Sequence, residues 1–166
     1  MEIIDIILKD TFINVVIFIT FSKLINYKYT SRNKAIIFII SFIESLLEML
    51  FISVPTIIRL IVMCIIYGVI SAKTTKNKYK YSTILMFISL TITYLIYMIS
   101  IAFTAVSLKL VYKDIPESSI LILLIGMCIE IFVINLLFKM KRFKNGIPFL
   151  KNEEKVNNIG IIGVIF

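Results

Sequence analysis

The segment that decides the fold is residues 82–107, STILMFISLTITYLIYMISIAFTAVS, which contains no charged side chain. A helix rises about 1.5 Å per residue, so a helix of this length exceeds the ~30 Å hydrocarbon core of a bilayer. Soluble helices need a charged or polar face toward water, and the only polar side chains of this segment are uncharged hydroxyl residues. The segment therefore predicts a transmembrane helix.

The composition of the whole chain agrees with a membrane protein. Of its 166 residues, 60% are hydrophobic and 17% are charged, which leaves too little polar surface to cover a soluble core. The net charge is +8, but the basic residues lie between the hydrophobic segments. There they favour contacts with anionic lipid headgroups over nucleic-acid binding. The frequent Ile, Lys, Asn, Phe and Tyr have AT-rich codons and favour a bacterial source, hence a bacterial cell membrane.

Residues that usually carry catalysis or hold cofactors are scarce. The chain has no histidine, which removes the commonest general base and metal ligand. Cys64 and Cys128 both lie inside hydrophobic segments, without metal-ligand spacing, and are interpreted as small buried residues. The sequence has no glycine-rich phosphate loop and no nucleophile beside a base. We expect no enzyme activity, no cofactor and no metal site in this chain.

Further hydrophobic segments flank the first. They cover residues 11–25, 35–54, 56–72 and 119–138, and another begins at residue 159. Pro55 separates the second from the third, because proline lacks a backbone donor and disfavours helix in the preceding residue. These two segments are predicted to form a tight hairpin. The last segment reaches only Phe166, too short to cross a bilayer, so we expect a piece truncated from a longer protein. The predicted fold is all-α: residues 1–166 form a single domain, a polytopic transmembrane helical bundle with five complete spans and the start of a sixth.

The connections between these segments alternate in charge. Residues 26–34 and 73–81 contain basic side chains and no acid, and residues 139–158 are predominantly basic. The amino-terminal residues and residues 108–118 carry no basic excess. Because basic connections remain in the cytoplasm, the sequence predicts an external amino terminus and a cytoplasmic loop at residues 139–158.

Ionisable residues within the predicted spans are costly and are candidates for function. They are Glu44 and Glu48 in the second span, Arg59 in the third and Glu130 in the fifth. Counted from the turn at Val54, Glu48 and Arg59 lie at nearly equal depth, so we predict an ion pair between them. That pair either pins the two helices together or lines a cavity that opens outward. The counting assigns no partner to Glu44, and a proton or cation relay through Glu44 and Glu130 is an alternative role.

Polar side chains also recur along residues 82–107 at steps of three and four residues, which places them on one helix face. They are Ser89, Thr93, Tyr97, Ser100, Thr104 and Ser107. Small hydroxyl residues on one face usually mark packing against neighbouring membrane helices. The alternative is a face that lines a ligand site.

Residues 139–151, KMKRFKNGIPFLK, lie between the fifth and sixth predicted segments and carry a family resemblance. The chain resembles the amino-terminal membrane domain of clostridial GHKL-type sensor histidine kinases, the accessory gene regulator (AgrC-like) sensors. The resemblance covers the whole chain in hydropathy and topology, and it is specific over residues 141–150. It implies a receptor for a secreted cyclic peptide, with six or seven spans before a cytoplasmic kinase, and a homodimer. The phospho-acceptor histidine and ATP-binding motifs of that family have no counterpart in these residues.

The leading interpretation is therefore the sensor domain of a two-component signalling histidine kinase used in quorum sensing. A peptide would reach it from outside, near the Val54–Pro55 turn and residues 109–118, and bind through Glu48, Arg59 and the polar stripe. The second interpretation is a small-molecule or ion transporter, or its membrane substrate-binding subunit, with a path lined by Glu44, Glu130 and the same stripe. A membrane peptidase is disfavoured because no histidine is present to activate a thiolate. For a bacteriocin-immunity protein the sequence offers no test.

Overall fold

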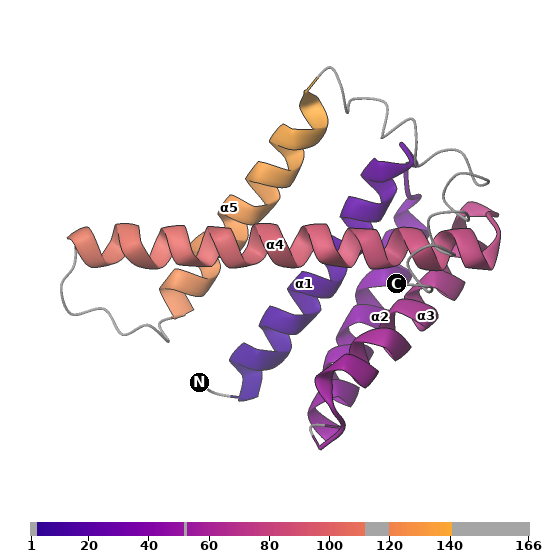
Figure 1. The fold of residues 1–166 in the computed structure, drawn as a ribbon, viewed down its shortest axis with the longest axis horizontal. Coiled ribbons are helices and arrows are strands. Elements are labelled where there is room, and N and C mark those ends of the chain that lie inside the picture. Colours follow the sequence, from indigo (N-terminus) through magenta and orange to yellow (C-terminus); the bar gives the residue numbers. More distant parts are fainter. Residues whose placement is uncertain (1–2, 52, 112–119, 141–166) are drawn as a thin grey trace, which may run out of the picture.

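The computed structural model describes residues 3–51, 53–111 and 120–140, and nearly all of them are helical (Figure 1). The helices are α1 (Ile3–Leu24), α2 (Ser31–Leu50), α3 (Thr56–Thr75), α4 (Tyr79–Val111) and α5 (Ile120–Lys139). No strand occurs within these ranges, which confirms the all-α prediction. The predicted start of a sixth helix at residue 159 and the segment 141–150 lie outside the described residues.

Three of these helices are long and apolar enough to cross a membrane. They are Thr56–Thr75 in α3, Tyr79–Leu110 in α4 and Leu121–Lys139 in α5. The chain thus has the character of a membrane protein. Helices α1 and α2 are long enough but carry more charged side chains: Asp5, Lys9, Asp10 and Lys23 in α1, and Arg32, Lys34, Glu44 and Glu48 in α2.

The helix ends follow from local backbone chemistry. Helix α2 ends at Leu50, four residues before the predicted limit. Phe51 N still bonds to Leu47 O at 3.0 Å, and the chain then turns, with a hydrogen bond from Val54 N to Phe51 O at 2.9 Å. Pro55 then directly precedes α3. Proline suits the start of a helix, because its φ is fixed near the helical value and its missing backbone N–H would have no partner there. At the other end of the bundle, Thr30 caps α2 by accepting a hydrogen bond from Asn33 N at 3.3 Å.

Helices α1 and α4 together form the centre of the bundle, because each of them packs against three other helices. Helix α1 packs closely against α2 and α4 and also contacts α5, while α4 packs closely against α3 and α5. In Figure 1, α4 crosses α1 and α5 obliquely. At about 1.5 Å per residue, the 33 residues of α4 make a helix well beyond the ~30 Å hydrocarbon thickness, which is compatible with this tilt. The buried core includes Phe18 and Phe21 of α1, Tyr67 of α3 and Leu85 of α4.

Helices α2 and α3 are more loosely associated than the predicted tight hairpin. They are joined by a short turn, yet they are not among the closely packed helix pairs. Their outer faces expose large apolar side chains, among them Phe38 and Ile39 of α2 and Ile57 and Ile61 of α3. Such faces suit lipid contact, because acyl chains are as apolar as these side chains.

Gly68 allows α3 to approach α4 closely. A Cβ atom built on Gly68 would lie 2.7 Å from the Cα of Thr83 in α4. A Cβ on Gly126 of α5 would instead meet the flexible end of the Ile101 side chain. We expect Gly68→Ala to destabilise the bundle by about 1–3 kcal/mol, as overpacking does, and Gly126→Ala to cost clearly less. Unfolding of both variants in SDS, followed by circular dichroism, measures this; equal stability of the two variants would contradict the assigned crossing.

Candidate functional site

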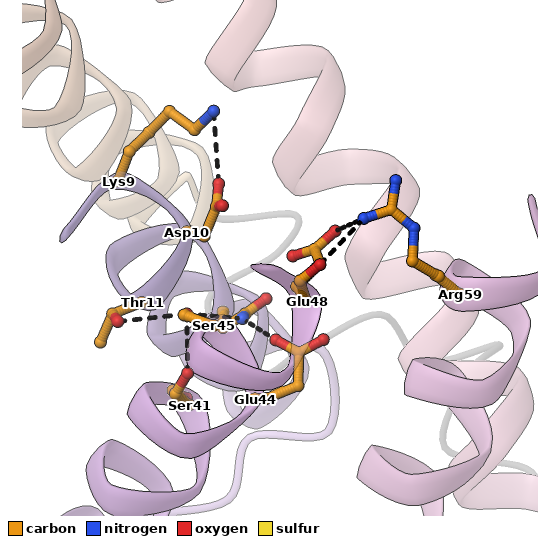
Figure 2. A network of polar contacts seen from close by, with 9 residues as sticks. Lys9, Asp10, Thr11, Ser41, Glu44, Ser45, Glu48 and Arg59 are labelled. Carbon is orange, nitrogen blue, oxygen red and sulfur yellow. Dashed lines mark hydrogen bonds and ion pairs between the residues drawn. The ribbon is translucent and has the colours of Figure 1, made fainter. Parts of the chain in front are cut away.

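The polar side chains of α2 lie on one face. Ser41, Glu44, Ser45 and Glu48 are spaced by three, one and three residues, which places them together on a helix. That face meets α1, where Thr11 and Asn14 are buried. The polar face of α2 and the buried polar groups of α1 thus meet in a polar contact inside the bundle (Figure 2).

Ser45 is the hydroxyl at the middle of this contact. Its Oγ accepts hydrogen bonds from Thr11 Oγ1 at 3.1 Å and from Asn14 Nδ2 at 3.5 Å. The same hydroxyl donates to the Ser41 carbonyl oxygen at 2.8 Å. The two bonds from Thr11 and Asn14 join α1 to α2 and satisfy donors of buried side chains.

Glu44 joins three helices. Its Oε2 accepts a hydrogen bond from Asn14 Nδ2 of α1 and another from the Tyr67 hydroxyl of α3, the latter at 3.3 Å. The Tyr67 ring also packs against Phe18 of α1, with ring centroids 4.6 Å apart. Sequence counting found no partner for Glu44, because it compared α2 with α3 alone and looked only for a charged partner. Asn14 lies on α1, and Tyr67 of α3 is uncharged. The sequence signal was Asn14, an amide inside a hydrophobic segment.

Glu48 and Arg59 form the predicted ion pair between α2 and α3. Arg59 Nη1 lies 3.4 Å from Glu48 Oε1, and the two side chains are 21% and 27% exposed (Figure 2). Arg59 also donates to the Glu48 carbonyl oxygen at 3.5 Å and to Thr56 Oγ1 at 3.2 Å. Lys9 and Asp10 of α1 form a second ion pair at 3.3 Å, within electrostatic range of Glu48.

A cavity of about 310 Å³ lies between α2 and α3 beside this pair. Glu44, Glu48 and Arg59 contribute its polar groups, and Val62 and Ile66 belong to its apolar wall. The cavity reaches the α2–α3 turn, because Phe51 and Val54 also line it. It therefore combines one acid, an ion pair and an apolar wall, which suits a small amphipathic group.

We expect Arg59→Leu to lower the free energy of unfolding by about 1–3 kcal/mol, because it leaves the Glu48 carboxylate without its counter-charge in a largely shielded position. The double variant Glu48→Gln/Arg59→Leu should recover part of this loss, since no charge is then uncompensated. Thermal unfolding in detergent, measured for the single and double variants, checks the coupling. Additive losses would show that the pair contributes no coupling.

The polar stripe of α4 faces other helices. Ser89, Thr93, Ser100 and Thr104 are buried and Tyr97 is half-buried. Thr93 donates to Thr20 Oγ1 of α1 at 3.1 Å, while Ser89 and Thr104 donate to carbonyl oxygens of α4 itself. These contacts agree with the packing interpretation of the stripe, and none of the stripe residues lines the cavity between α2 and α3.

Glu130 of α5 is isolated within the part of the chain that the structure describes. Its side chain is 0% exposed, and neither carboxyl oxygen has a hydrogen-bond partner there. Tyr97 of the α4 stripe lies within electrostatic range of it. Glu130 therefore has no direct hydrogen bond to Glu44. The alternative role of the two acids as a relay would need a further group to carry the proton between them.

Among the described residues, no group of three or more His, Cys, Asp or Glu lies close enough to hold a metal ion. In comparisons with family models, curated proteins and solved structures, nothing matches this chain.

Proposed function

We propose that this chain is a membrane sensor domain that binds an extracellular ligand in the cavity between α2 and α3. One observation carries the proposal: Glu44 lines that cavity and also bonds to Asn14 of α1 and Tyr67 of α3. A ligand that pairs with Glu44 competes with contacts that hold three helices together. Ligand binding and helix arrangement are then coupled through one side chain.

The orientation of the domain is supported by the way its basic segments meet. The Tyr27 hydroxyl donates to the Thr74 carbonyl oxygen at 3.0 Å, which brings residues 26–34 beside the basic end of α3. The Lys23 Nζ lies 6.0 Å from the centre of the Phe138 ring, near the end of α5. Under the positive-inside rule this end is cytoplasmic, all five helices cross the bilayer, and a sixth begins near residue 159. The amino terminus and the cavity then face outward, and residues 139–158 face the cytoplasm, where the kinase of AgrC-like sensors lies.

The chemistry of the ligand follows from the cavity and the family resemblance. A volume of about 310 Å³ is near the lower limit of small-ligand sites, so one or two side chains of a larger ligand fit. The apolar wall suits a bulky hydrophobic side chain, and the Glu44 carboxylate suits a basic group. A secreted cyclic peptide, as bound by AgrC-like sensors, meets these requirements while its ring remains outside. In that family the receptor works as a homodimer attached to a histidine kinase.

Tryptophan fluorescence offers a direct test, because the chain has no tryptophan of its own. Ile66→Trp places a reporter in the cavity wall, and Phe132→Trp on the exposed face of α5 is the control. In lipid nanodiscs, the peptide fraction of medium conditioned by cells that carry the native gene should shift the emission of the first reporter saturably. The second reporter should not respond, and adding Glu44→Gln should weaken the response at least tenfold.

The proposal fails if no peptide fraction distinguishes the two reporters, or if Glu44→Gln leaves the response unchanged. Fractionation of an active medium then identifies the peptide by mass spectrometry.

A transporter is the second candidate, and the isolated Glu130 favours it. Buried ionisable groups without partners are expensive in a membrane and commonly belong to proton or ion pathways. Proton-coupled uptake by vesicles containing the chain, abolished by Glu130→Gln but retained in Glu44→Gln, would favour transport over sensing.

A further inference from the structure

A second and larger cavity lies at the basic end of the bundle, toward the opposite end of α2 from the Glu44 cavity. Its volume is about 720 Å³, and it is formed by the last turns of α1, the α1–α2 connection and the start of α2. Lys23, Lys28 and Lys34 line it, and its lining includes no acidic residue. Its lining shares no residue with the Glu44 cavity.

The walls of this cavity change from polar to apolar toward the membrane. Phe18 and Ile37 belong to its apolar wall, whereas Ser22 and Asn26 add hydrogen-bonding groups near the lysines. Phe18 precedes Lys23 by five residues, which is about 7.5 Å along a helix. A molecule in the cavity thus meets positive charge at one end and hydrocarbon at the other.

The polar end is held in place by tertiary contacts. The Tyr27 hydroxyl donates to the Thr74 carbonyl oxygen of α3 at 3.0 Å, and the Tyr27 and Tyr29 rings pack edge to face with centroids 5.4 Å apart. Both tyrosines line the cavity. The connection that carries Lys28 is therefore braced against α3, so the cavity is a built feature of the bundle.

We propose that this cavity binds an anionic phospholipid, with the phosphate group between the three lysines and an acyl chain along the apolar wall. The charge argues for an anion, because three cations without an acid repel one another until a counter-charge enters. The apolar wall argues for a lipid over a free anion, because an inorganic phosphate would leave it uncovered. The position argues likewise, since basic pockets between membrane helices at the headgroup level bind anionic lipid heads.

Lipid binding to the purified chain in detergent tests this assignment. The probes are short-chain phosphatidylglycerol, phosphatidylcholine of the same chain length, and inorganic phosphate, and the readout is the midpoint of thermal unfolding together with lipid adducts in native mass spectrometry. We expect saturable stabilisation and one tightly retained adduct with phosphatidylglycerol alone. Lys28→Gln/Lys34→Gln should weaken that binding at least tenfold.

The matched control is Lys73→Gln/Lys80→Gln, which removes the same charge from exposed residues that do not line the cavity. It should change the binding less than twofold, and Lys28→Arg/Lys34→Arg, which keeps the charge, should retain it. Equal weakening by both glutamine pairs would overturn the proposal in favour of diffuse surface attraction. If inorganic phosphate stabilises the chain as much as phosphatidylglycerol does, the cavity is a site for free anions and the proposal is wrong. If phosphatidylcholine binds as tightly as phosphatidylglycerol, the lysines do not select an anionic lipid, and the proposal is wrong as well.

Discussion

Glu44→Leu is expected to lower the free energy of unfolding by about 1–3 kcal/mol, which is the cost of leaving buried polar partners unsatisfied. The Tyr67 hydroxyl and the Asn14 amide both donate to Glu44, and both of these side chains are buried. Leucine fills the space but accepts no hydrogen bond. Because the partners lie on α1 and α3, the loss loosens the contacts among three helices. SDS-induced unfolding monitored by circular dichroism measures the effect.

The control for this variant is Glu44→Gln, which keeps an acceptor oxygen of the same reach and removes the negative charge. We expect its stability to remain within about 1 kcal/mol of the native value, since the net worth of an interhelical hydrogen bond in a membrane is of this order or less. If Glu44→Leu is as stable as Glu44→Gln, the carboxyl does not join the three helices. Comparing the two variants also separates the structural role of Glu44 from its role in binding. Glu44→Gln keeps the acceptor for Asn14 and Tyr67 but lacks the negative charge that a basic ligand group needs.

The Glu48–Arg59 pair was predictable from sequence, whereas the partners of Glu44 were not. A short turn fixes the relative depth of residues on the two helices that it joins, so counting from Val54 was sufficient for Glu48 and Arg59. Which other helix packs against α2 depends on the whole bundle. Asn14 becomes a partner only because α1 lies in the centre, and nothing local to residues 11–25 dictates that position.

The same distinction holds for the apolar helices. The period of the stripe in residues 82–107 indicated which face of α4 is buried, because a helix repeats every 3.6 residues. The contact from Thr93 to Thr20 needed the tertiary structure. Connection length also misled in one place: the short turn at Pro55 predicted tight packing of α2 against α3, yet a cavity with ionisable side chains separates them.

Glu130→Leu is expected to stabilise the bundle by about 1–3 kcal/mol, the opposite sign from Glu44→Leu. A buried carboxyl loses its hydration, and here no hydrogen bond from the described residues offsets the loss. Replacing a poorly satisfied buried polar group with an apolar one of similar volume is commonly neutral or stabilising. Unfolding in SDS measures the change, and Glu130→Gln, which stays polar, should gain much less.

The sign of this result tells what Glu130 is for. A residue that costs stability persists where its chemistry is needed, as buried ionisable groups at functional sites do. A Glu130→Leu variant that is more stable but inactive in signalling or uptake would therefore assign Glu130 a direct role in function. A variant that is less stable would show that the carboxyl has a structural partner, and the transporter interpretation would lose its main support. A more stable variant with full activity would leave the Glu44 cavity as the remaining candidate site.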